Sequence, residues 1–251
     1  MPTKGNNWPS GLFSEPFGRA REWHHEIVSL FCLVHGSTQG ASCWDLLIPR
    51  LRNAGHECVA TKLPTDAPDA SATHYADLIA RSIPADRADA IVVAHSASGL
   101  FLPLVPERRR LRRIVFLGAV LPQIGKSLQD QVKEDREMFN PEWLGKDPTK
   151  DEQIALRFLF HDCSPEASRW ALDRMSLMFA RQAIVEVCPL QSWPDVPASY
   201  ILCVDDRAIQ PSWSRRASRE RLGVDPIELP GGHCPYVSRP QELADTLTAL
   251  G

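Results

Sequence analysis

Short apolar runs alternate with amphipathic segments along most of the chain. The runs are rich in β-branched residues and end in glycine, proline or polar residues, which is typical of strands buried on both faces. They cover 27–36, 56–64, 88–96 and 112–121. Between them, apolar residues recur at helical spacing over 41–55, 73–84 and 97–105. This alternation predicts βαβ units and a mostly parallel, doubly wound sheet.

The alternation stops after Leu121. Beyond it lie helical patterns without a convincing strand, over 127–139, 150–160 and 165–187. The last of them follows Ser164, a helix-capping residue, and has proline at its first position. Strands then resume, and a helix closes the chain; these elements cover 198–206, 225–232 and 239–250.

Length and composition fit one large α/β domain. The chain has 251 residues, 43% of them hydrophobic, which is enough to build a sizeable core. We therefore predict an α/β core of residues 27–121 and 196–251 that carries a helical cap over 122–195. Residues 1–26 are rich in glycine, proline, serine and asparagine, and we interpret them as a loose extension.

Charge and cysteine usage bound the partners and the compartment. The formal net charge is −3, which gives no electrostatic case for a nucleic-acid partner, and the one basic run, 107–113, is interpreted as a solvated helix end. No apolar stretch approaches the roughly 20 residues of a membrane span, and no signal peptide is recognised. Seven cysteines without a C-x-x-C pair favour a reducing environment. We expect a cytoplasmic protein without a membrane partner, either monomer or homodimer.

The segment AHSASG, residues 94–99, lies where the strand over 88–96 turns into the next helix. Ala94 and Ser98 stand two residues before and after Ser96. A sharp strand-to-helix turn needs small residues there, and it holds the serine in a strained conformation with its hydroxyl outward. The position therefore indicates a nucleophilic serine.

A nucleophilic serine needs a base and an acid to orient that base. His233, in LPGGHCPY, is the only histidine after residue 161. The strand over 198–206 ends in two aspartates, of which we prefer Asp206 and keep Asp205 as the second choice. Serine, acid and histidine then follow one another in the order used by one class of such triads.

A tetrahedral intermediate also needs backbone donors for its oxyanion. Ala97 starts the helix after the serine, where amides are free and the helix dipole is positive. The segment HGS, residues 35–37, turns backbone amides toward the carboxyl end of the first strand. We assign the Ser37 and Ala97 amides as the oxyanion hole and interpret His35 as a structural loop residue.

Four segments carry a family resemblance: HGSTQGASCW, AHSASG, DDRAIQP and GGHCPYVSRPQELA. In this order they resemble the α/β-hydrolase superfamily over nearly all of 27–251. The first is similar to the plant methylesterase and hydroxynitrile-lyase branch. In the lyases of that branch a threonine follows the first histidine and a lysine follows the catalytic one, whereas this chain has Gly36 and Cys234. The resemblance implies an α/β-hydrolase fold with a helical cap and favours ester hydrolysis.

Candidate substrate contacts come from two places. Within the helical pattern over 165–187, some apolar residues suit either packing of the cap on the sheet or an apolar wall over the serine; they are Trp170, Met175, Met178 and Phe179. Gly36 and His95 are further candidate substrate contacts, because Gly36 adjoins the oxyanion segment and His95 adjoins the serine.

We expect neither a metal nor a cofactor. His161, Asp162 and Cys163 are adjacent, but no second pair with ligand spacing supports a metal site. The sequence thus predicts a serine hydrolase that cleaves a carboxylic ester, a lactone included, of a small and partly apolar substrate through an acyl-enzyme. Two alternatives stay open: a C–C bond hydrolase or hydroxynitrile-lyase-like enzyme on the same triad, and a non-catalytic receptor for a small ligand.

Overall fold

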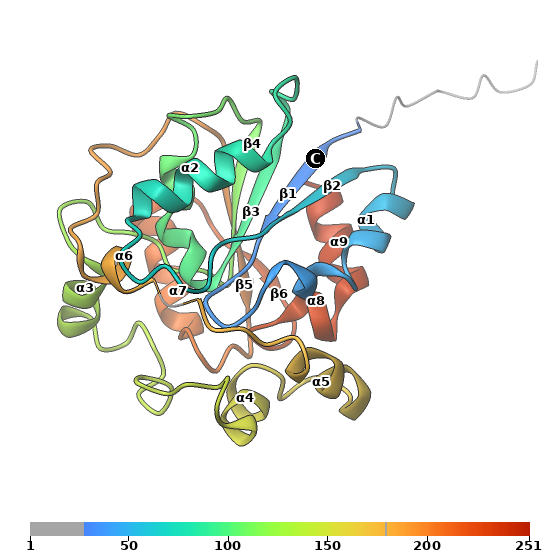
Figure 1. Ribbon diagram of the computed structural model, residues 1–251, viewed down its shortest axis with the longest axis vertical. Helices are drawn as coiled ribbons and strands as arrows, with labels where there is room; N and C mark the ends of the chain where they lie inside the picture. Colours follow the sequence, from blue (N-terminus) through green and yellow to red (C-terminus); the bar gives the residue numbers. More distant parts are fainter. Residues whose placement is uncertain (1–27, 179) are drawn as a thin grey trace, which may run out of the picture.

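The computed structural model of the protein describes residues 28–178 and 180–251 (Figure 1). At its centre lies a six-stranded sheet in the order β2-β1-β3-β4-β5-β6, in which every neighbouring pair is parallel. The strands are β1 (Leu30–Val34), β2 (Glu57–Thr61), β3 (Ile91–His95), β4 (Arg113–Leu117), β5 (Ala198–Cys203) and β6 (Ile227–Leu229). Each lies inside a predicted run, and the predicted α/β fold with a parallel sheet is confirmed.

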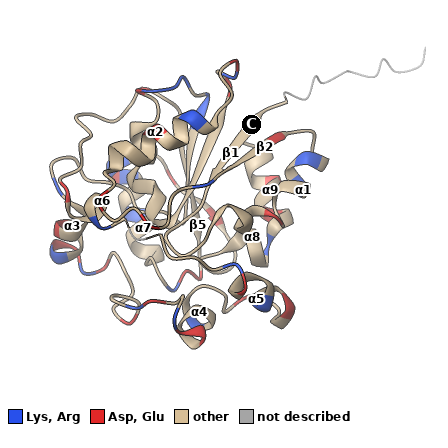
Figure 2. Ribbon diagram, viewed as in Figure 1, with Lys and Arg blue, Asp and Glu red and all other residues tan. Residues whose placement is uncertain are grey.

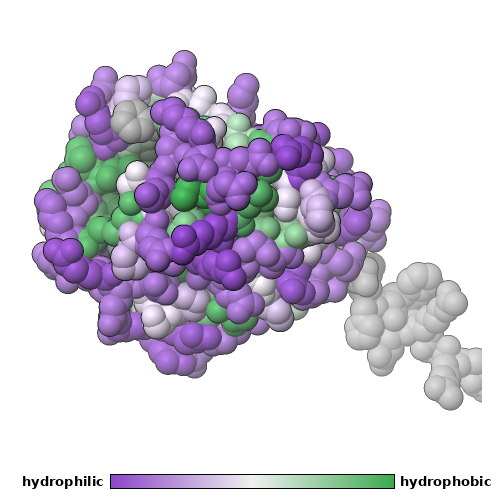
Figure 3. Space-filling view, turned by 90° about the horizontal axis from the view of Figure 1, so that it is seen from below, coloured by the Kyte–Doolittle hydropathy of each residue, from purple (hydrophilic) through white to green (hydrophobic). Residues whose placement is uncertain are grey.

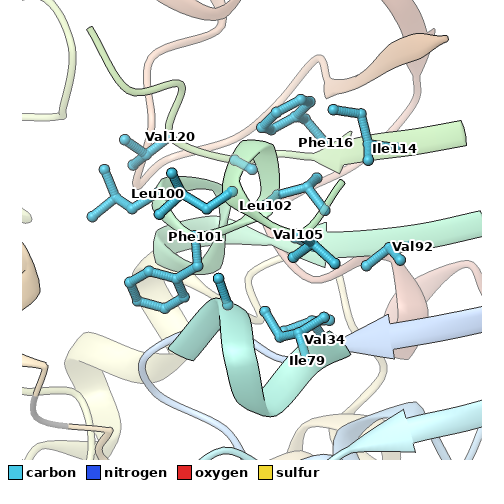
Figure 4. Packing of buried hydrophobic residues seen from close by; sticks show 14 of the residues in the cluster. Val34, Ile79, Val92, Leu100, Phe101, Leu102, Val105, Ile114, Phe116 and Val120 are labelled. Carbon is cyan, nitrogen blue, oxygen red and sulfur yellow. The ribbon is translucent and has the colours of Figure 1, made fainter. Parts of the chain in front are cut away.

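Two apolar layers cover the sheet, one on each face. Along β1, Cys32 and Val34 belong to the layer that includes α2 (Ala72–Ser82), whereas Phe31 and Leu33 pack with α1 (Ile48–Asn53) and α9 (Pro240–Thr248) on the other face. Figure 4 shows the α2 layer from close by. Both faces of the central strands β1 and β3 are buried, and for this reason their sequences are continuously apolar instead of alternating, whereas the edge strands β2 and β6 are partly exposed.

Several helices begin at side-chain caps. Ser164 starts α5 (Pro165–Leu172) and accepts a hydrogen bond from the Ala167 amide, so the cap predicted there is confirmed. Ser71, Ser127 and Asp151 start α2, α3 (Leu128–Glu134) and α4 (Glu152–Phe158) in the same way. The remaining α-helices of the described residues are α6 (Arg181–Val185), α7 (Pro211–Ala217) and α8 (Pro235–Ser238).

The single helix predicted over 165–187 is wrong. The chain leaves the helix after α5 and re-enters one only at α6. Between them, the amides of Ser176 and Met178 donate to the carbonyls of Thr38 and Ser37, at 3.1 and 2.6 Å. Backbone pairing with the loop after β1 therefore replaces helical hydrogen bonds, a long-range effect that helical spacing does not record.

Two other predicted helices are shorter than expected. The helix over 41–55 consists of a 3₁₀ turn, Ala41–Trp44, followed by α1, and Pro49 lies in the first turn of α1, where proline is tolerated. The helix over 97–105 consists of two 3₁₀ turns, Ser96–Leu100 and Leu102–Leu104. The α7 and α8 helices were not predicted.

The described part of 122–195 contributes α3 to α6 and no strand of the sheet. In Figure 1, α4 and α5 lie together below the sheet, and α3 and α6 lie together at its side. The division into core and cap stays a prediction, and the extension predicted over 1–26 falls outside the described residues.

Charged residues of both signs are mixed over the outer helices and loops (Figure 2). The basic run over 107–113 makes local contacts: Arg108 pairs with Asp77, and Arg112 donates to the Gly251 carbonyl at 3.0 Å. All seven cysteines are free thiols. Within the part of the chain that the structure describes, no helix is both long and apolar enough to cross a bilayer. The cytoplasmic location stays a prediction.

Candidate active site

Ser96 lies directly after β3 in a strained turn. Its φ is +55°, and among the described residues no other non-glycine residue has a positive φ. This conformation turns the side chain out of the sheet at the carboxyl end of the strand. Ala94 and Ser98 are fully buried on either side, and the Ser98 hydroxyl donates to the His35 carbonyl at 2.5 Å. The sharp turn predicted from the small flanking residues is present.

Two glycines let neighbouring segments approach this turn. A Cβ on Gly36 would lie 2.9 Å from the Cβ of Ser96 and 2.9 Å from Nδ1 of His95. A Cβ on Gly99 would lie 2.1 Å from the Val120 carbonyl oxygen. The loops after β1 and β4 therefore press against the turn from both sides. The sequence reasoning missed the role of Gly99, which depends on a residue of another strand end.

His233 joins Ser96 to Asp206. Nε2 of His233 lies 3.1 Å from Oγ of Ser96, and Nδ1 lies 2.7 Å from Oδ2 of Asp206. Because a carboxylate only accepts, Nδ1 carries the proton and Nε2 is left to accept from the serine hydroxyl. Both the imidazole and the carboxylate are almost fully buried, with side-chain exposures of 3% and 2%.

The carboxylate of Asp206 is fixed by its own loop. Its Oδ1 accepts from the amides of Ala208 and Ile209, at 2.8 and 3.0 Å, so Oδ2 is left to face the imidazole. Asp205 is exposed, and its Oδ2 accepts instead from the Gly231 amide at 3.3 Å. The structure brings Asp206, the aspartate that the sequence analysis preferred, to His233.

A cavity of about 570 Å³ opens beside Ser96. Ser37, Ser96 and Ala97 are among the residues that line it. Most of the remaining wall is apolar and includes Leu100, Phe101, Val120, Leu128, Phe139 and Met178. Gln129, Lys133 and Lys146 add polar groups, and no described carboxylate lines it. Figure 3 views the molecule from below, the side where α4 and α5 lie in Figure 1, and shows apolar residues surfacing between polar ones.

A family model described as "Alpha/beta hydrolase family" matches residues 33–246 of the chain. The protein belongs to the alpha/beta hydrolase family.

Individual alpha/beta hydrolases resemble the chain over most of its length. It is 28% identical to "Probable hydrolase R7" from Phoma sp., over 87% of this chain and 96% of that protein. It is 26% identical to "Methylesterase 1" from Arabidopsis thaliana, over 86% and 93%. The solved structure of polyneuridine aldehyde esterase superimposes with a TM-score of 0.73 at 23% identity, and covers 89% of this chain and 99% of that one. This structural likeness shows the fold.

Ser37 and Ala97, whose amides the sequence assigns to an oxyanion hole, both line the cavity of this alpha/beta hydrolase. Ala97 is in the first turn of the 3₁₀ segment, where amides have no intrahelical acceptor. The backbone of Ser37 is fixed by a hydrogen bond, because its carbonyl accepts from the Met178 amide. The two residues come from different loops, and their part in an oxyanion hole stays a prediction.

The predicted substrate contacts are only partly brought together. Met178 lines the cavity, and Phe179 lies outside the described residues. Trp170 packs instead in a narrow gap with Tyr236, and Met175 pairs with Gln39 in a β-bridge. Because the predicted helix is interrupted, its spacing does not place these residues on one wall, and the interpretation of Trp170 and Met175 as cavity lining is corrected.

Gly36 and His95 likewise do not line the cavity. Gly36 packs behind Ser96, and His95 is fully buried, with its Nε2 donating to the His233 carbonyl at 2.9 Å. Burial lowers the pKa of His95 well below its usual value, and the nearby His233 lowers it further. His95 is therefore neutral and supports the backbone of His233.

His35 is a structural loop residue, as the sequence analysis expects. Its Nδ1 donates to the Gly36 carbonyl at 2.8 Å, and its Nε2 accepts from the Leu63 amide at 3.2 Å. Burial lowers the pKa of His35, which keeps the ring neutral for these two bonds. Over residues 28–178 and 180–251, no group of three or more histidine, cysteine or acidic side chains is placed to hold a metal ion.

Proposed function

We propose that this alpha/beta hydrolase cleaves a carboxylic ester of a small, partly apolar molecule, with Ser96 as the nucleophile. The observation that carries the proposal is the continuous line from the Ser96 hydroxyl through His233 to Asp206, at 3.1 and 2.7 Å, ending in an apolar cavity. The relatives named as esterases support the choice of bond.

The chemistry follows from the geometry. Oγ of Ser96 attacks the ester carbonyl while Nε2 of His233 takes its proton, and the carboxylate of Asp206 stabilises the charged imidazole. His233 then gives the proton to the departing alcohol, which leaves an acyl group on Ser96. Water, activated by the same imidazole, releases the acid. The Ser37 and Ala97 amides stabilise the oxyanion, and loss of one such donor costs on the order of 100–1000-fold in rate.

The cavity favours a substrate of moderate size. Its volume of about 570 Å³ is within the range of roughly 300–1,000 Å³ that is usual for small-molecule sites. Leu100, Phe101 and Val120 present hydrocarbon surface next to Ser96, so an apolar acyl or alcohol group gains more from binding than an acetyl group.

The lyase alternative is disfavoured at two positions. Gly36 stands where the lyases of the plant branch have a threonine, and in this backbone a Cβ there would crowd Ser96 at 2.9 Å. Cys234 stands where they have a lysine; it is fully buried and its sulfur accepts from the Tyr236 hydroxyl at 3.2 Å. Neither position supplies the proton-handling group of a cyanohydrin lyase.

A fluorophosphonate probe tests the nucleophile. We expect wild type to be labelled stoichiometrically, Ser96→Ala to be unlabelled, and Ser42→Ala, which changes an exposed serine, to be labelled as wild type is. Folded wild type that stays unlabelled would favour the non-catalytic receptor instead. A series of p-nitrophenyl esters then tests the cavity: rates should rise from acetate to longer acyl chains, and equal rates would remove the apolar-substrate proposal.

A further inference from the structure

The turn between α4 and α5 contacts both loops that carry the acid and the base. Nε2 of His161 donates to the Asp205 carbonyl at 3.0 Å, one residue before Asp206. The carboxylate of Asp162 accepts the Gly232 amide at 2.8 Å, one residue before His233. This turn belongs to the segment between β4 and β5, called the insertion below. Two adjacent side chains of the insertion thus reach the two backbone positions that precede the imidazole and its carboxylate.

The two loops are also bonded to each other at this point. The Asp205 amide donates to the Gly231 carbonyl at 3.0 Å, and the Gly231 amide donates to the Asp205 carboxylate at 3.3 Å. His161 and Asp162 of the insertion add one hydrogen bond to each of these two loops. A displacement of the turn would therefore move both loops, and with them the separation of Nδ1 of His233 from Oδ2 of Asp206.

The glycines before His233 leave room for this contact. A Cβ on Gly232 would lie 2.7 Å from Nε2 of His161 and 2.8 Å from Oδ1 of Asp162. A Cβ on Gly231 would lie 2.6 Å from Oδ2 of Asp162. A side chain at Gly232 would displace the polar ends of His161 and Asp162, and one at Gly231 would displace those of Asp162 and Arg239. The Gly-Gly pair therefore does more than permit a tight loop, because it admits two polar side chains of the insertion to the backbone.

We propose that His161 and Asp162 are positioning residues that hold the loop of His233 and the loop of Asp206 in a fixed position relative to each other. The proposal rests on the proposed function, since it assigns these two side chains to the same reaction. Asp162 is the stronger member: its side chain is only 12% exposed, and without it the buried Gly232 amide has lost its acceptor. Misplacement of a reacting group by about 1 Å costs on the order of 100-fold in rate.

Four variants test the proposal. Asp162→Ala removes the acceptor, Asp162→Asn keeps an oxygen in its place, and His161→Ala removes the second contact. Glu152→Ala is the matched control, because it breaks the α4–α5 ion pair with Arg169 at 3.0 Å without touching the turn. We expect kcat and the rate of fluorophosphonate labelling to fall about 10- to 100-fold in Asp162→Ala and less in His161→Ala, with KM within about twofold. Asp162→Asn and Glu152→Ala should stay within about threefold of wild type.

A second readout does not depend on turnover. The hydrogen-bonded Nδ1 proton of His233 gives a downfield proton resonance, which should be present in wild type and Glu152→Ala and lost or broadened in Asp162→Ala. Unchanged kcat and an unchanged resonance in Asp162→Ala would overturn the proposal, as would equal losses in Asp162→Ala and Glu152→Ala. If Asp162→Ala does not fold, His161→Ala decides by the same two measurements. An unreactive wild type with a normal resonance would count against the proposed function alone.

Discussion

Replacing Gly99 with alanine tests whether close packing holds the turn at Ser96. The new Cβ would lie 2.1 Å from the Val120 carbonyl oxygen, and ordinary contact begins at 3.4 Å, so the two segments must separate by about 1.3 Å. The Val120 amide donates to the Ser96 carbonyl at 3.0 Å, and this bond is lost or stretched by such a movement.

The energy follows from these two effects. Overpacking of a tight interior costs about 1–3 kcal/mol, and loss of one hydrogen bond about 0.5–1.5 kcal/mol. Together they predict that Gly99→Ala lowers the free energy of unfolding by about 1.5–4.5 kcal/mol. For a chain of this length each kcal/mol corresponds to about 2–4 °C in Tm, so the expected decrease is about 3–18 °C.

Thermal and urea unfolding measure this effect, with Gly40→Ala as the control. A Cβ on Gly40 meets nothing within 4 Å, and its backbone angles of −115° and −175° are ones that alanine adopts freely. Gly40→Ala should leave the stability unchanged or raise it by up to about 1 kcal/mol. A Gly99→Ala protein as stable as Gly40→Ala would refute the close-packing argument.

Three further predictions address the acid, a buried hydroxyl and pH. Asp206→Asn should lower kcat on the order of 10⁴-fold, because the amide no longer holds the productive tautomer, and a loss under tenfold would contradict the assigned role. Tyr200→Phe should cost about 1–3 kcal/mol in urea unfolding, since the Tyr200 hydroxyl donates to the buried Ala119 carbonyl at 2.7 Å. Burial lowers the pKa of His95 and His35 in the folded chain, whereas the pKa of a histidine in the unfolded chain is near 6.5. Below that pH the unfolded chain therefore binds more protons than the folded chain does. The free energy of unfolding should therefore fall below about pH 6.5, by up to about 1.4 kcal/mol per pH unit for each histidine, and equal urea midpoints at pH 7.5 and 5.5 would contradict this.

The sheet and the line of three side chains could be predicted because each rests on a local signal. Both faces of β1 and β3 are buried, and this leaves an unbroken apolar run in the sequence. Small residues around Ser96 mark the turn after β3. The sequence preferred Asp206 to Asp205, but it did not show the contact that separates them: the amides of 208 and 209 bind Oδ1 of Asp206 and leave its Oδ2 to face His233.

The wall of the cavity could not be predicted for a different reason. Helical spacing in the 165–187 pattern suited either packing of the cap or a cavity wall, but residues 173–178 leave the helix to pair with the loop after β1. Most of the apolar lining comes instead from the 3₁₀ turn after Ser96 and from residues 128–148. These side chains lie far apart in the sequence, and their spacing carries no sign of a common cavity.

The insertion makes hydrogen bonds to backbone groups of the loops around the site at two separate places. Near its end, the amides of Ser176 and Met178 bond the loop that carries the Ser37 amide. Near its middle, His161 and Asp162 bond the loops of the acid and the base. Backbone hydrogen bonds fix position more strictly than apolar contact does, because they depend on direction as well as distance. Changes in the insertion should therefore alter the rate of the chemical step as well as the choice of substrate.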